Sequence, residues 1–265
     1  MDLTIGCTTR PYRDLTHAES FYRIAAAGYT DVAVFRNKGN HGVHSESTPD
    51  EVSAVRNAAQ NAGITPSMLI GQTKLNLGLE AAVDDYKRLI DNTSSLGVTW
   101  LLDCGTSKEE YYDDYFELMR QAAPHAQEAG VNITMKPHGG ISLTVEHLLG
   151  AMEKVNHPAF AICYDPGNII HYTKGEMRPE SDAAEVASSV STGIIKDCEL
   201  NDGEPNVMVT AGDGLVDFHT VLSALVQGGF DGPLYVECVG STELSEVDRD
   251  IAYTLGYVKG ILSGQ

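Results

Sequence analysis

The chain has 265 residues, of which 42% are hydrophobic and 21% charged, and its formal net charge is −19. This composition is typical of a water-soluble globular protein with one large α/β domain or two small ones. The acidic balance argues against a nucleic-acid partner and against an anionic membrane surface, because both require a basic protein face.

Targeting and redox signals are sparse in the sequence. No uncharged apolar run approaches about 18 residues, so no transmembrane helix is expected. The opening MDLTIGCTTR lacks the basic and apolar regions of a signal peptide, which makes a cytoplasmic location the default expectation. Five cysteines without a C-x-x-C motif predict neither a disulfide framework nor a zinc ribbon.

Apolar runs of β-type composition alternate with helical patterns along the chain. The runs predict strands over residues 3–7, 31–35, 64–70, 98–104, 131–136, 159–165, 192–197 and 233–238. Helices are expected over 16–27, from Ser47 or Thr48 onward, and over 79–96, 113–129, 143–154, 180–188, 216–229 and 244–262. Eight such units predict a (β/α)8 TIM barrel, formed by one domain over residues 1–265. The absence of G-x-G-x-x-G after the first strand argues against a dinucleotide-binding sheet.

The segment MKPHGG ends the fifth predicted strand. Lys136 and His138 are two residues apart and therefore share one face of that strand, which a proline and two glycines then end. In TIM barrels the catalytic groups lie at the C-terminal ends of the strands. We therefore expect this segment at the mouth of the barrel.

Other predicted strands also end in polar or charged residues. These are Asp103, Lys136, His138, Asp165, Lys196, Asp197 and Glu237. Each charge interrupts or ends an apolar run, where an unpaired charge costs several kcal/mol. Because the strand ends converge on one mouth, these groups are expected to neutralise one another, a metal ion or a substrate.

Two carboxylates and an imidazole on neighbouring strands form a reasonable cage for Mn²⁺, Mg²⁺, Co²⁺ or Zn²⁺. We expect Asp165, Glu237 and His138 as its ligands, with water or substrate in the remaining positions. Each residue also has a structural interpretation. Asp-Pro-Gly-Asn is a good turn sequence, Glu237 could form a salt bridge with Lys136 or Lys196, and His138 could be a satisfied structural histidine.

Lys136 has several open roles beside these acids. Its ammonium could stabilise an enediolate, exchange a proton, form a Schiff base or simply pair with a carboxylate. In the loop after the second strand, His41 could bind substrate or metal, although a flexible polar loop is the simpler interpretation. His171 is expected to line the pocket, and TAGDGLVDF is a glycine-rich loop with weak phosphate-binding potential.

The sequence resembles the xylose isomerase-like barrel superfamily of sugar phosphate isomerases and epimerases. The resemblance rests on GYTDVAVF, ICYDPGN, IIKD, GDGLVDF and GFDGPLYVEC. It implies one divalent metal, with Asp165 and Glu237 matching two of the usual ligands. Lys136 stands where a carboxylate is usual, Ile194 where a histidine is usual, and Ala33 where a glutamate is common. KPHGG is similar to the inosose dehydratase type, which supports His138 as a ligand.

The leading functional hypothesis is a metal-dependent isomerase or epimerase of a small sugar or keto-sugar, acting through a metal-stabilised enediolate. The expected catalytic residues are Lys136, Glu237 and Asp197, and the expected substrate-binding residues are Asp103, Asn168, His171, Lys196 and His41. The alternatives are a lyase or dehydratase on a keto-sugar or keto-cyclitol, and a catalytically silent sugar-binding barrel. A DNA-repair endonuclease is disfavoured by the acidic charge. A homo-oligomer is an open expectation, since barrels of this size often pair.

Overall fold

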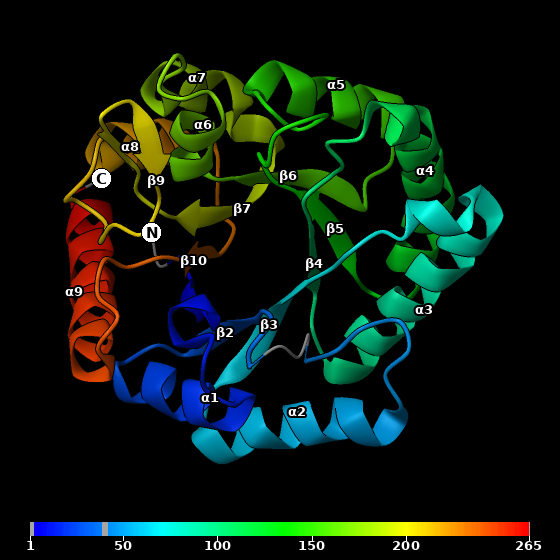
Figure 1. The fold of residues 1–265 in the computed structure, drawn as a ribbon, viewed down its shortest axis with the longest axis horizontal. Helices are drawn as coiled ribbons and strands as arrows, with labels where there is room; N and C mark the ends of the chain where they lie inside the picture. The colour runs from blue at the N-terminus through cyan, green and yellow to red at the C-terminus, as the bar shows by residue number, and fades with distance from the viewer. Residues whose placement is uncertain (1–2, 39–41, 265) are drawn as a thin grey trace.

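The computed structural model describes residues 3–38 and 42–264 of the chain. Eight parallel strands close into a barrel in the order β1-β10-β7-β6-β5-β4-β3-β2, and helices surround it (Figure 1). The predicted TIM barrel fold is therefore confirmed. Within the two described ranges, none of the helices combines the length and the apolar character needed to cross a bilayer.

The barrel strands are short and lie close to the predicted runs. They are β1 (Ile5–Thr8), β2 (Asp31–Val34), β3 (Thr65–Ile70), β4 (Trp100–Asp103), β5 (Asn132–Met135), β6 (Phe160–Tyr164), β7 (Val190–Ile195) and β10 (Leu234–Val236). The ring closes where β1 pairs with β10, with Cys7 opposite Val236. All eight strands point the same way, so the loops that follow them gather at one mouth.

Side chains cap the starts of several outer helices. Thr16 and Glu19 form a capping box at the start of α1, and Thr48 and Glu51 form another at α2. The helices are α1 (His17–Ala26), α2 (Pro49–Ala62), α3 (Leu79–Leu96), α4 (Tyr112–Glu128), α5 (Val145–Val155), α6 (Pro166–Tyr172), α7 (Pro179–Val186), α8 (Phe218–Gln227) and α9 (Leu244–Ser263). Single 3₁₀ turns are η1 (Arg10–Tyr12), η2 (Leu75–Leu77), η3 (Glu109–Tyr111) and η4 (Ala187–Ser189).

Two elements were not expected from the sequence. Helix α6 begins at the Asp-Pro-Gly-Asn segment, because the Asp165 side chain accepts a hydrogen bond from the backbone N–H of Asn168 and Pro166 occupies the first turn. A small hairpin also follows β7, formed by β8 (Glu199–Asn201) and β9 (Glu204–Asn206). Both lie on the mouth side, after strands that carry candidate site residues.

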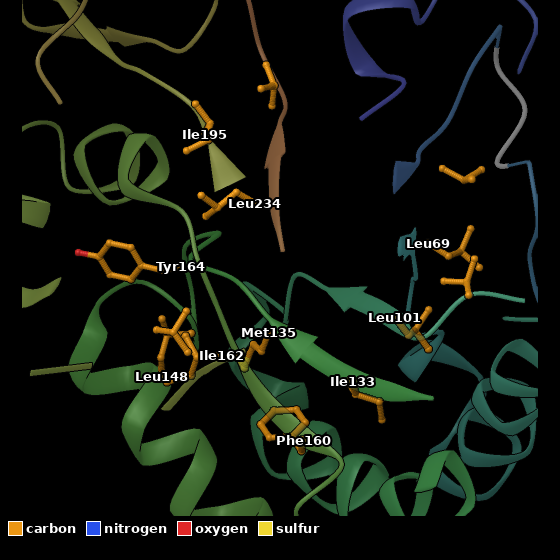
Figure 2. Packing of buried hydrophobic residues seen from close by; sticks show 14 of the residues in the cluster. Leu69, Leu101, Ile133, Met135, Leu148, Phe160, Ile162, Tyr164, Ile195 and Leu234 are labelled. Carbon is orange, nitrogen blue, oxygen red and sulfur yellow. The ribbon is translucent and has the colours of Figure 1, made fainter. Parts of the chain in front are cut away.

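The core has two layers because side chains alternate across each strand. One set fills the space between strands and helices; Figure 2 shows Leu148 of α5 beside Ile162 of β6 in this layer. The other set fills the barrel interior and consists of Ala33, Phe35, Met68, Leu102, Cys163, Ile194 and Tyr235. This alternation determines which residues at the strand ends can face the mouth.

The close approach of α6 to β7 gives a test of the fold. A Cβ built at Gly167 would lie 2.5 Å from the backbone oxygen of Lys196, which leaves no room for a side chain. We expect Gly167→Ala to lower the free energy of unfolding by about 1–3 kcal/mol. Gly150→Ala in α5 is the matched control, since a Cβ there meets nothing within 4 Å. It should be neutral or stabilise by up to about 1 kcal/mol in urea unfolding. Equal effects of the two changes would contradict the tight packing of α6.

Candidate active site

The alternation of side chains brings four charged residues together inside the mouth. Asp165, Lys196 and Glu237 each lie two residues beyond an interior residue, namely Cys163, Ile194 and Tyr235. They therefore point inward from β6, β7 and β10. Lys136 lies two residues beyond Thr134, whose hydroxyl contacts Thr192 across the interior. These four residues are called the charge ring below.

Each lysine of the charge ring contacts both carboxylates. The ammonium nitrogen Nζ of Lys136 lies 2.7 Å from Glu237 Oε2 and 3.3 Å from Asp165 Oδ2. The Nζ of Lys196 lies 2.7 Å from Glu237 Oε1 and 3.0 Å from Asp165 Oδ2. Positive and negative groups therefore alternate around the ring.

The charge ring is almost completely removed from water. The exposed fractions of its side chains range from 0% for Asp165 to 4% for Glu237. Burial alone would raise the pKa of Glu237, but the two ammonium groups outweigh it and hold the pKa below its ordinary value. Burial alone would lower the pKa of Lys136, but Glu237 and Asp165 raise it well above its ordinary value. Each of these two residues thus keeps its charge because of its partners.

Helix α6 supports one side of the charge ring. The side-chain oxygen of Asn168 accepts a hydrogen bond from Lys196 Nζ at 3.0 Å, and its amide nitrogen donates to the backbone oxygen of Pro137 at 2.7 Å. Asn168, expected to bind substrate, therefore links the fifth and seventh strand ends through its side chain. Asp165 has a second task, since its Oδ1 caps the same helix.

A large cavity of about 870 Å³ opens beside the charge ring. It is lined by the loops after β1 to β5, whereas the charge ring comes from β5, β6, β7 and β10. Its basic lining residues are Arg10, Arg13, Arg36 and Lys108, and its uncharged polar ones include Gln72, Thr73, Asn76, Thr106 and Ser107. This lining suits a small ligand rich in hydroxyl groups or carrying an acidic substituent.

Three residues connect the cavity with the charge ring. Arg10 lines the cavity, and its Nε lies 3.9 Å from Glu237 Oε1 and 3.3 Å from Cys238 Sγ. The ring of Phe35 lies 5.9 Å from Lys136 Nζ, within reach of a cation–π interaction. His138, two residues beyond Lys136, is the third.

His138 is exposed at the mouth, and its ring packs against Tyr172 with the centroids 5.0 Å apart. Partial desolvation, followed by the nearby ammonium groups of Lys136 and Lys196, lowers its pKa to about 4. The imidazole is therefore neutral at physiological pH and available to accept a hydrogen bond from a ligand. Its backbone N–H is bound to Ser142.

His171 lies on α6, with its ring edge-on to Tyr172 at 4.9 Å. Its Nδ1 is buried without a hydrogen-bond partner in the described residues, and desolvation lowers the pKa of the side chain. Its role in substrate binding stays a prediction. His41 lies outside the described residues.

Asp103 is bound by other groups of the protein, and its expected role in substrate binding stays a prediction. It lies two residues beyond Leu101, which packs outward, so it faces the helices. Its carboxylate accepts hydrogen bonds from Tyr86 OH at 3.1 Å, Tyr115 OH at 2.7 Å and the Gly105 backbone at 2.8 Å. Although Asp103 borders the cavity, these partners make it an anchor for α3 and α4.

Asp197 is likewise bound by groups of the protein, and its expected catalytic role stays a prediction. It follows Lys196 directly, so the two side chains take opposite faces of the strand. Its oxygens accept four backbone N–H groups, from Cys198, Gly212, Gly214 and Val216, at 2.8–3.0 Å. The backbone N–H groups of the glycine-rich loop thus bind Asp197, so they are not available to bind a phosphate.

The three predicted metal ligands are only partly brought together. Asp165 and Glu237 do converge, but ammonium groups occupy the space between them. Among the described residues, no group of three or more His, Cys, Asp and Glu side chains is placed to hold a metal ion. The residues therefore do not fit a resident divalent ion in this arrangement.

The basic residues of the cavity were missed by sequence reasoning. Arg10, Arg36 and Lys108 follow the first, second and fourth strands, so the barrel prediction already placed them on the mouth side. The signal was their position after strand ends. These residues do not interrupt an apolar run, so the pattern of interrupted runs does not reveal them.

A family model described as xylose isomerase-like TIM barrel matches residues 21–256. The chain belongs to this family. The resemblance found in the sequence is thereby confirmed. No curated protein sequence matches the chain.

Several solved structures share this fold at low sequence identity. A protein of this type from Mycobacterium smegmatis in complex with magnesium has a TM-score of 0.77 at 16% identity, covering 98% of both chains. A xylose isomerase domain protein from Planctomyces limnophilus has a TM-score of 0.71 at 23% identity, covering 90% of both chains. D-psicose 3-epimerase from Clostridium cellulolyticum H10, with D-tagatose, has a TM-score of 0.76 at 13% identity and covers 98% of this chain and 99% of its own.

Each residue of the charge ring should contribute strongly to the stability of the folded protein, because its removal leaves a buried charge unpaired. Lys136→Met would leave a buried carboxylate without one of its two counter-charges, and we expect a loss of about 3–5 kcal/mol in the free energy of unfolding. Lys259→Met, at an exposed position on α9, is the control and should change stability by less than about 0.5 kcal/mol. A Lys136→Met protein as stable as the control would show that the ring is not neutralised as described.

The lowered pKa of His138 predicts an acid-sensitive contribution to stability. Between pH 6.5 and about 4, the unfolded chain binds a proton at this residue that the folded chain does not. The contribution is therefore complete above pH 6.5 and is lost as the pH falls towards 4. The free energy of unfolding should decline more steeply over this range in the native protein than in His138→Gln. An NMR titration midpoint for His138 near 6.5 would contradict the prediction.

Proposed function

We propose that the chain is an isomerase or epimerase of a small sugar or keto-sugar, with its reaction centre where the charge ring meets the cavity. The observation that carries this proposal is the position of Lys136 and Glu237, paired at 2.7 Å beside a polar cavity of about 870 Å³ at the C-terminal mouth of the barrel. D-psicose 3-epimerase and L-ribulose 3-epimerase are among the proteins that share its fold.

In the proposed reaction, the sugar lies in the cavity with its hydroxyl groups against the polar lining. Gln72, Asn76 and Thr106 offer hydrogen-bond donors and acceptors there. The carbonyl end reaches the boundary formed by Arg10, Phe35 and His138. The ammonium of Lys136 reaches this boundary through its contact with Phe35.

Lys136 is proposed as the electrophile and Glu237 as the base. The bond between hydrogen and the carbon next to the carbonyl breaks, the proton passes to Glu237, and the electron pair forms the enediolate. Its oxyanion is stabilised by the ammonium of Lys136. Return of the proton from Glu237 to the neighbouring carbon, with the hydroxyl proton passing to the former carbonyl oxygen, gives the isomer. The epimer forms when the enediolate takes a proton from cavity water on its opposite face and Glu237 gives its own proton back to water.

The strong pairing within the charge ring sets a condition on this chemistry. Glu237 is a weak base while it holds two ammonium groups, because they lower its pKa. A substrate oxygen that takes up the ammonium of Lys136 weakens that pairing and makes Glu237 more basic. Binding of the carbonyl therefore prepares the base, and Arg10, 3.9 Å from the same carboxylate, keeps the proton acceptor in place.

A sugar-binding barrel without catalysis is the second candidate. The four buried charges neutralise one another, and Glu237 and Lys136 are shielded from the solvent, so the ring has the features of a purely structural network. The lyase alternative uses the same enediolate, which would then expel a leaving group from the next carbon. These three functions differ in the products they form.

A panel of keto-sugars in deuterated water tests the proposal. The panel includes neutral sugars and sugars with phosphate or carboxylate groups, because basic residues line the cavity. For a substrate of the native protein, NMR should show deuterium entering beside the carbonyl and an interconverted sugar as product. Glu237→Gln should lower the rate about 10²–10⁴-fold.

Glu185→Gln, at an exposed position on α7, is the matched control and should keep the native rate. Saturable binding of a sugar without exchange or conversion would contradict the isomerase and favour the binding protein. Loss of water or of another group from the sugar would contradict it in favour of the lyase.

A further inference from the structure

The two lysines of the charge ring share the same two carboxylates. Both Nζ atoms lie within 3.3 Å of the same Asp165 oxygen, and each holds one oxygen of Glu237 at 2.7 Å. We propose that Lys136 and Lys196 together take the place of a divalent ion in this barrel, so that its site neither holds nor needs a metal. The proposal concerns the site of the proposed function, but it does not depend on the activity.

The charge balance supports this substitution. Two carboxylates carry two negative charges, and the two ammonium groups carry two positive ones, the same charge as a divalent cation. A metal ion added to the ring would place two further positive charges beside two ammonium groups in a site with almost no exposed surface. Like charges repel strongly when water does not screen them.

The surrounding side chains offer little to a metal. On the β2 side the ring faces Phe35, and Ile194 precedes Lys196 on the inward face of β7. Asn168 is already bound through both of its side-chain polar atoms. His138 remains as a nitrogen donor, but its ring lies against Tyr172, and the ammonium groups lower its affinity for a proton. A cation with two carboxylates and one such histidine would also have to displace both lysines.

The two lysines have different capacities for a ligand. Lys196 has three partners, Asp165, Glu237 and Asn168, which matches its three N–H donors. Lys136 has two carboxylate partners among the described residues. Its third N–H donor has the Phe35 ring at the cavity boundary nearby. Lys196 therefore fixes the ring, and Lys136 retains one N–H for a substrate oxygen in the position where a metal would polarise it.

The decisive experiment measures metal binding by the native full-length protein. Protein is purified from cells grown with added metals, and its content of Mn, Mg, Co and Zn is measured by mass spectrometry after dialysis. Thermal unfolding is then followed with each chloride salt and with a chelator. A metal that binds the folded protein and is present at a free concentration of about 100 times its Kd would raise the melting temperature by roughly 5–10 °C. The proposal expects no stoichiometric metal and no rise.

An isosteric variant shows whether a rise in melting temperature comes from metal bound in the charge ring or elsewhere. Asp165→Asn removes a ring charge but keeps the ability to cap α6. A rise in melting temperature that occurs in the native protein and is lost in Asp165→Asn would place a metal in the ring and overturn the proposal, as would stoichiometric metal after dialysis. A rise of equal size in both proteins comes from metal elsewhere on the acidic surface and supports a metal-free ring.

A direct view of the ammonium groups gives a second, independent readout. Buried ammonium groups exchange protons slowly with water, so ¹⁵N NMR of the lysine side chains should show separate signals for the ring lysines, whereas exposed Lys259 should not give one. These signals should persist when Mn²⁺ is added, and their selective broadening would overturn the proposal. An absence of sugar conversion would contradict the proposed function and leave these metal results unaffected.

Discussion

The mutual neutralisation of four buried charges governs the arrangement of this barrel's mouth. Lys136, Asp165, Lys196 and Glu237 come from four different strands, and none of them can be buried at low cost without its partners. Correct closure of β5, β6, β7 and β10 is therefore coupled to ion pairing. The same pairing fixes the charge of the site, since each carboxylate contacts both ammonium groups.

The mouth is divided into two halves with different properties. The loops after β1 to β5 line a wide polar cavity with basic residues, and the ends of β5, β6, β7 and β10 hold the charge ring. Arg10, Phe35 and His138 lie where the halves meet. In the proposed function, the first half binds the sugar while its carbonyl end faces the second half.

The internal hydrogen bonds of Asp103 and Asp197 share one physical cause. Asp103 and Asp197 end apolar strands as Asp165 and Glu237 do, and the sequence treats all four carboxylates alike. Side chains alternate along a strand, however, so Lys196 and its neighbour Asp197 cannot both face the mouth. The same alternation, which puts Lys136 and His138 on one face, separates the inward acids from those that anchor helices and loops. The two-residue period of the strands therefore predicts which acids face inward, whereas residue type alone does not.

The sequence by itself determined the barrel, because the alternation of strand and helix patterns admits few other closed folds, and it located the mouth at the polar strand ends. It also supplied every member of the charge ring. Only the tertiary structure decided how these residues pair. Distances between strands that are far apart in the chain depend on barrel closure and side-chain direction, and these place ammonium groups, rather than an open cage of ligands, between Asp165 and Glu237.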